Sequence, residues 1–194
     1  MNDKELVLSV KNGNTHAFRY LVEQNKNLVW HMVLRMIKQN EDAEDICQEV
    51  FMKVFRDIGK FRGESKLSTW IASVTYNICI DHLRKKGREK LDFTDDPWIL
   101  SKDLTENLTP GRTLNIAEIR NIVNEIINQM PVNYRSVMTL FHLEEMSYKE
   151  IVEITGMPEG TVKSYLNRGR EMIREKIIKI VPDIQSVLFE TDQY

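Results

Sequence analysis

The sequence predicts an all-α protein with two small helical domains joined by a flexible linker, the second domain containing a helix-turn-helix. Three observations predict this class. Apolar residues recur at helical spacing over most of the chain, strand-like alternation is absent, and glycine and proline are scarce, at 8 and 5 of 194 residues. The apolar and charged contents, 42% and 29%, are typical of a soluble globular protein.

The sequence contains no targeting segment and no motif typical of a catalytic or metal-binding site. It has no apolar run of about 18 residues and no secretory signal, so we expect no membrane insertion. Cys47 and Cys79 lie in apolar helical patterns without metal-ligand spacing, which favours buried, reduced thiols in a cytoplasmic protein. We found no catalytic dyad, metal cluster or phosphate-binding glycine loop, and we therefore expect neither an enzyme nor a cofactor.

The first domain is predicted to begin with two amphipathic helices within residues 5–38, separated by Gly13 and Asn14. A third helix is expected over residues 41–58, and residues 41–50 hold five acidic residues and no basic one. The side of this helix opposite its apolar face carries Asp45, Gln48, Glu49, Met52 and Arg56. A methionine among carboxylates and an amide predicts the centre of a protein-binding patch, although one stray exposed methionine is the plainer alternative.

Residues 59–69 are predicted to form a loop that bears one aromatic residue, and residues 70–86 a helix that is mostly apolar. The narrow polar stripe of this helix consists of Ser73, Asn77 and Arg84, with Asp81 at its edge. Residues 82–90 hold five basic residues and one acidic residue. A positive track beside such a loop suits a separated DNA strand, and a core helix with a charged end is the alternative.

Residues 89–113 are acidic, contain prolines and show no sustained periodicity of apolar residues. They therefore predict an exposed linker between domains that fold separately. The domains are therefore expected at residues 1–88 and 114–181, with a tail at 182–194 that carries no pattern.

The most informative stretch runs over residues 147–179. Ser147 and Glu150 form a capping box that predicts a helix start, and Gly156 followed by Pro158 predicts a tight turn before a second helix. The inner face of the second helix includes Gly169, where the missing side chain lets another helix approach closely.

The outer face of that second helix is basic and carries an amide. Residues 160–179 hold six basic and two acidic residues. Arginine and lysine suit guanine edges and phosphates, and asparagine suits adenine. The pattern predicts a DNA-reading helix-turn-helix, with a plain helical hairpin that has a solvated charged face as the alternative.

Three stretches, in this order, resemble bacterial sigma factors of the sigma-70 family, and best its extracytoplasmic-function branch. They are DAEDICQEVFMKVF, GKFRGESKLSTWIASVTYNICIDHLRKK and MPVNYRSVMTLFHLEEMSYKEIVEITGMPEGTVKSYLNRGREMIREKI, and the likeness covers nearly the whole chain except the linker and tail. The resemblance implies a sigma factor that binds core RNA polymerase and directs initiation at promoters. The implied partners are core RNA polymerase, promoter DNA and an anti-sigma factor, without a small-molecule substrate.

The resemblance also implies roles for particular residues. Residues 1–88 would be sigma region 2 and residues 114–181 sigma region 4. The polymerase-binding surface would be Asp45, Gln48, Glu49 and Met52. The contacts to the −10 element, including a loop 61–69 that captures a flipped base, would be Arg62, Ser65, Lys66, Ser68, Thr69, Trp70, Asn77, Arg84 and Lys85. The contacts to the −35 element would be Thr161, Lys163, Ser164, Asn167, Arg168 and Arg174.

The formal net charge of −2 is unusual for a protein that binds DNA without a partner protein. A sigma factor does not need to be basic overall, because polymerase can supply most of the phosphate contacts. One alternative is a classical DNA-binding regulator with residues 1–88 as an effector or dimerisation domain. Another is a helical adaptor that binds only protein, which does not explain two separate basic patches.

Overall fold

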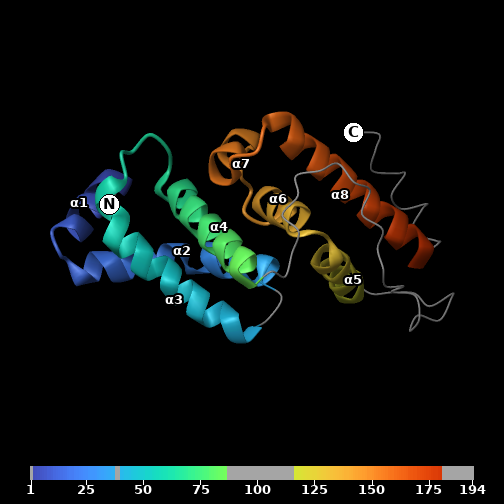
Figure 1. Cartoon of the computed structure of the whole chain (residues 1–194), viewed down its shortest axis with the longest axis horizontal. Helices are drawn as coiled ribbons and strands as arrows, with labels where there is room; N and C mark the ends of the chain where they lie inside the picture. Colours follow the sequence, from blue (N-terminus) through green and yellow to red (C-terminus); the bar gives the residue numbers. More distant parts are fainter. Residues whose placement is uncertain (1, 38–39, 87–115, 181–194) are drawn as a thin grey trace.

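The computed structural model describes residues 2–37, 40–86 and 116–180, and within these ranges it is built from α-helices and one short 3-10 helix, without a strand (Figure 1). The elements are α1 (Asp3–Lys11), α2 (Thr15–Met36), α3 (Asn40–Asp57), η1 (Ile58–Lys60), α4 (Leu67–Lys86), α5 (Ile116–Gln129), α6 (Val132–His142), α7 (Tyr148–Thr155) and α8 (Glu159–Ile180). The predicted all-α class is confirmed. The expected linker and tail lie outside the described residues.

The N-terminal half, α1 to α4, is a helical bundle around a continuous apolar core. Helix α2 packs against α1, α3 and α4, while α3 also packs against α4. The predicted break between the first two helices is present, because Gly13 has a positive φ of 81° and the side chain of Asn14 accepts a hydrogen bond from Ala17 N.

Helix α4 begins at Leu67, three residues earlier than the sequence predicted. The carboxylate of Asp3 in α1 accepts a hydrogen bond from Leu67 N at 2.9 Å, which satisfies one of the free N–H groups of the first turn. Because this cap comes from a distant part of the chain, local pattern did not reveal it. The loop therefore ends at Lys66, and Ser68 and Thr69 belong to the first turn of α4.

The C-terminal half, α5 to α8, contains the predicted helix-turn-helix. Ser147 and Glu150 form the expected capping box at the start of α7, and Gly156 ends that helix in the left-handed conformation, with φ of 70°. The close approach at Gly169 is also confirmed, since a Cβ there would lie 2.9 Å from the sulfur of Met138 in α6.

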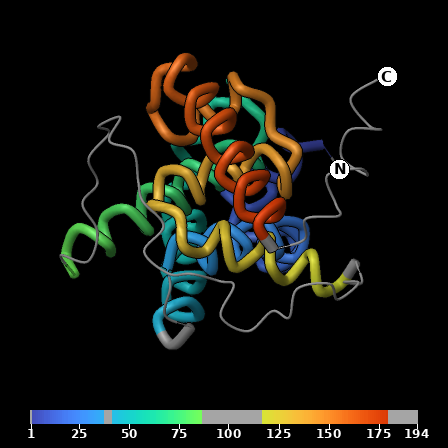
Figure 2. The backbone as a smooth tube through the Cα atoms, turned by 90° about the vertical axis from the view of Figure 1, so that its right-hand side faces the viewer, coloured from blue at the N-terminus to red at the C-terminus, as the bar shows by residue number. Residues whose placement is uncertain are grey.

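The two halves pack against each other, with α2 against α6 and α4 against α7 (Figures 1 and 2). The guanidinium of Arg135 in α6, which is 0% exposed, donates hydrogen bonds to the carbonyl oxygens of Met130 (2.6 Å) and Met36 (3.2 Å). Arg135 thereby joins the end of α5 to the end of α2. None of the described helices is long and apolar enough to cross a membrane.

Candidate nucleic-acid and protein interface

The predicted protein-binding side of α3 is exposed. Asp45, Gln48 and Glu49 are exposed. Met52 is 73% exposed, which confirms that its apolar side chain lies outside the core. A methionine in this position leaves an adaptable apolar contact among three polar groups.

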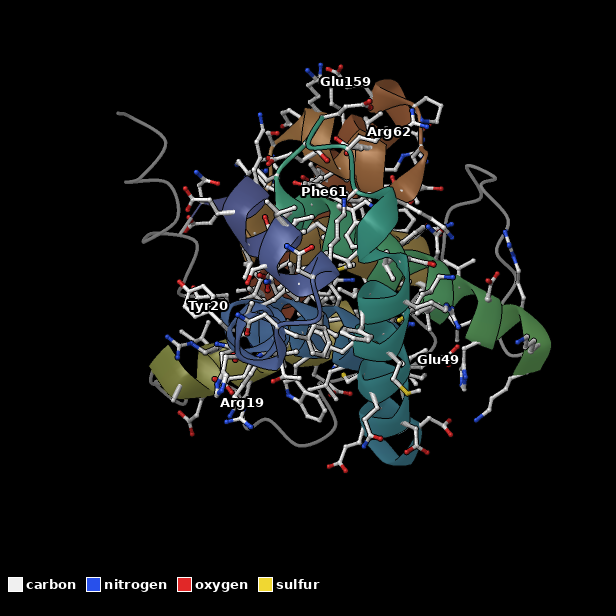
Figure 3. All side chains as sticks on the ribbon, turned by 90° about the vertical axis from the view of Figure 1, so that its left-hand side faces the viewer. Arg19, Tyr20, Glu49, Phe61, Arg62 and Glu159 are labelled. Carbon is white, nitrogen blue, oxygen red and sulfur yellow. The ribbon has the colours of Figure 1, made fainter. Side chains whose placement is uncertain are left out.

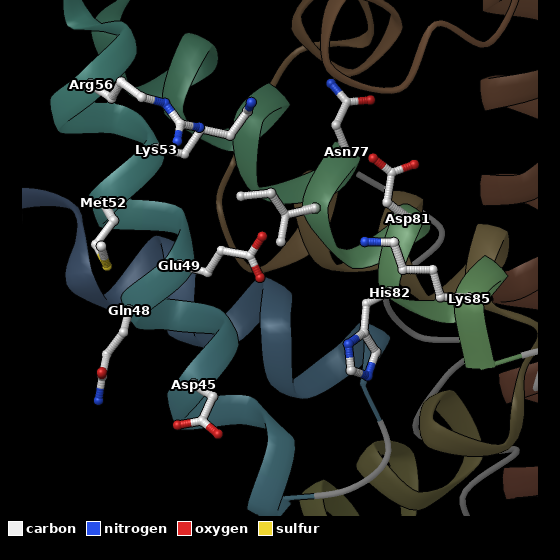
Figure 4. A pocket seen from close by; sticks show the side chains of 11 residues that line it. Asp45, Gln48, Glu49, Met52, Lys53, Arg56, Asn77, Asp81, His82 and Lys85 are labelled. Carbon is white, nitrogen blue, oxygen red and sulfur yellow. The ribbon is translucent and has the colours of Figure 1, made fainter.

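A hollow of about 400 Å³ separates this side of α3 from α4 (Figure 4). Asp45, Gln48, Glu49 and Met52 line one wall, and the facing wall includes Asn77, Asp81 and Lys85. Glu49 points across the hollow toward α4. The surface predicted to bind protein and part of the surface predicted to bind a DNA strand therefore meet here, which the sequence did not predict.

The polar stripe of α4 is arranged as the sequence predicted. Asn77, Asp81 and Arg84 are exposed and Ser73 is half-buried, and the exposed Lys85 lies beside them. Most apolar residues around the stripe are buried, and Trp70 is half-buried. Arg84 lies 3.5 Å from the carboxylate of Asp81, one turn back along the helix. The predicted single-strand track thus has an amide and two cations facing solvent.

The loop at residues 61–66 presents polar side chains and keeps its aromatic residue inside. Arg62 is exposed and Ser65 is half-buried. Phe61 is buried, with its ring centroid 5.8 Å from that of Trp70, which is itself half-buried. Phe61 therefore packs under the loop, and its ring does not project into solvent.

Two residues predicted to contact the −10 element instead face the C-terminal half. The ammonium of Lys66 lies 2.9 Å from the carboxylate of Glu150 in α7. Thr69 is 0% exposed, and its hydroxyl donates a hydrogen bond to the same carboxylate at 3.4 Å. A DNA strand can reach Thr69 only if α7 moves away from α4.

The surroundings of Glu150 favour its charged form. The hydrogen bond from Lys66 is the largest cause, and further hydrogen bonds from the backbone and hydroxyl of Ser147 act in the same direction. Together they lower the pKa of Glu150 from 4.5 to about 2.

The outer face of α8 carries the residues predicted to read the −35 element. Asn167, Arg168 and Arg174 are exposed, and Thr161 and Ser164 are half-buried.

Lys163 on the same face is exposed but partnered. Its ammonium lies 2.6 Å from the Glu159 carboxylate and 5.6 Å from the centre of the Tyr148 ring. The hydrogen bond to Glu159 raises the pKa of Lys163 above its usual value.

Sequence reasoning missed the polar contacts between the halves. Arg35 in α2 donates hydrogen bonds to the side chains of Asn124 (2.6 Å) and Asn128 (2.7 Å) in α5. His31 in α2 lies 2.8 Å from the Glu144 carboxylate. These partners are about 90 or more residues apart in the sequence, so no local motif predicts the contacts.

Both cysteines are free, but the predicted burial holds only for Cys79, because Cys47 is half-buried. Burial raises the pKa of the Cys47 thiol to about 11 and raises that of the fully buried Cys79 as well. Within the part of the chain that the structure describes, no cluster of three or more His, Cys, Asp or Glu could hold a metal ion.

Comparisons with known proteins match both halves. Residues 21–89 match the family Sigma-70 region 2, and residues 120–173 match Sigma-70, region 4. The chain is 31% identical over 179 residues to the ECF RNA polymerase sigma factor SigW of Bacillus subtilis, covering 90% of this chain and 96% of that protein. It is 34% identical over 182 residues to the ECF RNA polymerase sigma-E factor of Haemophilus influenzae, covering 91% of this chain and 96% of that one.

Two solved structures share the fold. The sigma factor RpoE of Bartonella quintana, in complex with the anti-sigma factor NepR, matches with a TM-score of 0.60 at 20% identity and covers 82% of this chain and 96% of RpoE. CnrH, in complex with the cytosolic domain of CnrY, matches with a TM-score of 0.60 at 16% identity and covers 89% of this chain and 95% of CnrH.

Proposed function

The chain belongs to the extracytoplasmic-function sigma factors of the sigma-70 family, and we propose that it recognises the −35 and −10 promoter elements and holds the melted −10 strand. The observation that carries this proposal is the separation of two exposed polar faces on two different helices. Asn167 and Arg168 lie on the outer face of α8, and Asn77 and Arg84 lie on the stripe of α4.

The −35 element would be read by α8 in the major groove of duplex DNA. Gly156 ends α7 in the left-handed conformation shortly before α8 begins, and the second helix of a helix-turn-helix enters the groove. Asn167 suits adenine and Arg168 suits guanine or a phosphate. Lys163 would exchange Glu159 for a phosphate when DNA arrives, because both partners are anionic.

The melted −10 strand would be held by the loop at residues 61–66 and by the stripe of α4. Arg62, Arg84 and Lys85 supply exposed positive charge for the strand backbone. Capture of unpaired bases shifts the duplex equilibrium toward the open form, so promoter opening at this site needs no bond-breaking chemistry in the chain.

Core RNA polymerase would dock on the exposed side of α3, at Asp45, Gln48, Glu49 and Met52. Carboxylates around an apolar centre favour a basic protein surface with an apolar contact of its own. The hollow between α3 and α4 would place the polymerase beside the −10 strand, because its two walls come from these two surfaces.

Binding to both promoter elements requires the two halves to separate. The elements lie about two DNA turns apart, roughly 70 Å, whereas α4 and α7 are in direct contact here. The domain division at residues 1–88 and 114–181 is part of this proposal, and an extended linker of 25 residues (89–113) reaches about 80 Å. The packed arrangement would belong to the protein before it engages DNA.

We extend the proposal to an anti-sigma factor as a partner of the free protein. RpoE, which shares the fold, was solved in complex with the anti-sigma factor NepR. An anti-sigma factor bound across both halves would favour the packed arrangement and keep Lys66 on Glu150 instead of on DNA.

In vitro transcription with bacterial core polymerase and a pool of random promoter sequences tests the proposal. We expect enrichment of templates with two conserved, dissimilar elements about two turns apart. Binding of the isolated chain to a palindrome without polymerase would contradict it and would indicate a classical regulator.

A further inference from the structure

The hydrogen bond between Asp3 and Leu67 joins the first turn of α1 to the first turn of α4. The carboxylate of Asp3 accepts from Leu67 N at 2.9 Å across 64 residues of sequence. The residue before a helix normally accepts from the N–H of the second or third helical residue, but Lys66 has no acceptor in its side chain, and the side-chain cap of this first turn comes from Asp3, on Leu67 N. Asp3 therefore supplies an acceptor at the start of α4, directly after the loop at residues 61–66.

Helix α1 also forms a wall of a hollow under that loop. The hollow measures about 470 Å³ and is lined by Asn2, Asp3 and Lys4 from the N-terminus and by Phe61, Gly63, Ser65 and Lys66 from the other side. Figure 3 shows α1 beside the chain segment that bears Phe61 and Arg62. The hollow is large enough for a nucleobase.

The backbone at Gly63 reinforces this contact. Gly63 has a φ of 74°, and a Cβ built there would lie 3.7 Å from Lys4 Cε. The turn of the loop therefore faces the side chain of Lys4, so α1 meets the loop at Gly63 as well as at Leu67.

We propose that Asp3 is a positioning residue for the capture of an unpaired base, an inference that rests on the proposed function. By capping α4 from α1, it fixes the length and shape of the loop, and so determines which base the hollow accepts. Without this cap, the first turn of α4 can unwind at Leu67 and the loop gains residues. The expected result is loss of discrimination among bases more than loss of binding.

Three variants separate this role from general effects of charge or folding. Asp3→Ala removes both the acceptor and the charge. Asp3→Asn keeps an acceptor oxygen but removes the charge, and asparagine caps helices about as well as aspartate. Glu5→Gln removes a charge from the same turn of α1 without touching the loop, and glutamine preserves the capping box that Glu5 makes with Asn2.

The measurement uses holoenzyme assembled from each full-length variant and core polymerase. The templates carry a fixed −35 element and a −10 region that is pre-melted and random in sequence, and the bound fraction is sequenced. We expect wild type to prefer one base at the captured position, and Asp3→Ala to reduce that preference about fivefold. Asp3→Asn and Glu5→Gln should retain it, and affinity for a −35 duplex should not change in any variant.

Two results would overturn the inference. The first is a wild-type preference that Asp3→Ala leaves unchanged while recovery of all templates falls equally, which would make Asp3 a purely structural cap. The second is a failure of Asp3→Asn to restore the preference. A wild-type holoenzyme that recovers all four bases equally would instead contradict the proposed strand capture itself, and with it this role of Asp3.

Discussion

The ammonium of Lys66 lies 2.9 Å from Oε1 of Glu150, and this ion pair joins the loop before α4 to the first helix of the helix-turn-helix. The side chain of Lys66 is 73% exposed and that of Glu150 is 19% exposed, so the pair lies at the edge of the contact between the halves. In the packed arrangement, Lys66, which is proposed to contact DNA, forms an ion pair with Glu150 of the same chain.

Glu150→Gln should favour separation of the halves. Glutamine preserves the capping box with Ser147, so α7 should remain folded while the ion pair is lost. An exposed pair contributes about 0.2–1 kcal/mol, which corresponds to a roughly 1.4- to 5-fold larger population of separated molecules. Spin labels on Asp81→Cys and Glu171→Cys, both on exposed helix faces, would measure the α4–α8 distance. Glu153→Gln on the exposed side of α7 is the control, and an equal effect of both substitutions would contradict this prediction.

The same ion pair predicts that the population of molecules with separated halves depends on pH under acidic conditions. The pKa of Glu150 is lowered from 4.5 to about 2, so its stabilising charge is fully present above about pH 4.5 and is lost as the pH falls toward 2. We expect the separated population of wild type to rise over this window by more than that of Glu150→Gln, which has no carboxylate to protonate. The distance measurement repeated from pH 6 to pH 2 checks this, and superimposable curves for the two proteins would contradict it.

Glu49→Lys should weaken binding to core polymerase without affecting folding. Glu49 is exposed on α3, where a substitution usually changes the free energy of unfolding by less than about 0.5 kcal/mol. Reversing its charge removes complementarity with a basic partner surface. The measurement is the affinity for core enzyme in the absence of DNA, with Glu23→Lys on the exposed side of α2 as the control. Equal affinities of Glu49→Lys and Glu23→Lys would rule out this surface.

Gly169→Ala should destabilise the C-terminal half, although alanine favours helices. A Cβ at this position would lie 2.9 Å from the Met138 sulfur and 3.2 Å from its Cγ. Overpacking costs about 1–3 kcal/mol against a gain in helix propensity of about 1 kcal/mol, so we expect a net loss of about 1 kcal/mol. Gly160→Ala, at a position of α8 with open space around it, should stabilise instead. Urea unfolding of both variants measures the difference, and two stabilising substitutions would contradict the close approach.

Features that depend on neighbouring residues were predictable from the sequence. The capping box at Ser147, the turn at Gly156 and the close packing at Gly169 each follow from residue type and helical spacing alone. The exposure of Met52 was predictable in the same way, because it lies opposite an apolar face.

Features that depend on distant residues were not predictable. Asp3 caps the first turn of α4, and the buried hydroxyl of Thr69 donates a hydrogen bond to Glu150 in α7. Arg135 is buried and donates a hydrogen bond to the carbonyl oxygen of Met36 at the end of α2, 99 residues away in the sequence. Each of these contacts joins segments whose proximity only the fold determines.

The most direct test of the account is whether the two DNA sites act on different steps. Arg168→Ala and Arg62→Ala each remove one exposed arginine, from α8 and from the loop respectively. Arg62 is preferred to Lys66 here because Lys66 also joins the two halves. Transcription by each holoenzyme is measured on duplex templates and on matched templates already melted at −10.

We expect Arg168→Ala to cost about 1–3 kcal/mol of promoter binding on the duplex. Its loss should shrink when the −35 element is altered and nearly vanish on the pre-melted template. Arg62→Ala should leave binding to the −35 duplex intact and impair opening. Equal defects of Arg168→Ala on duplex and pre-melted templates would contradict the division of labour between α8 and the loop.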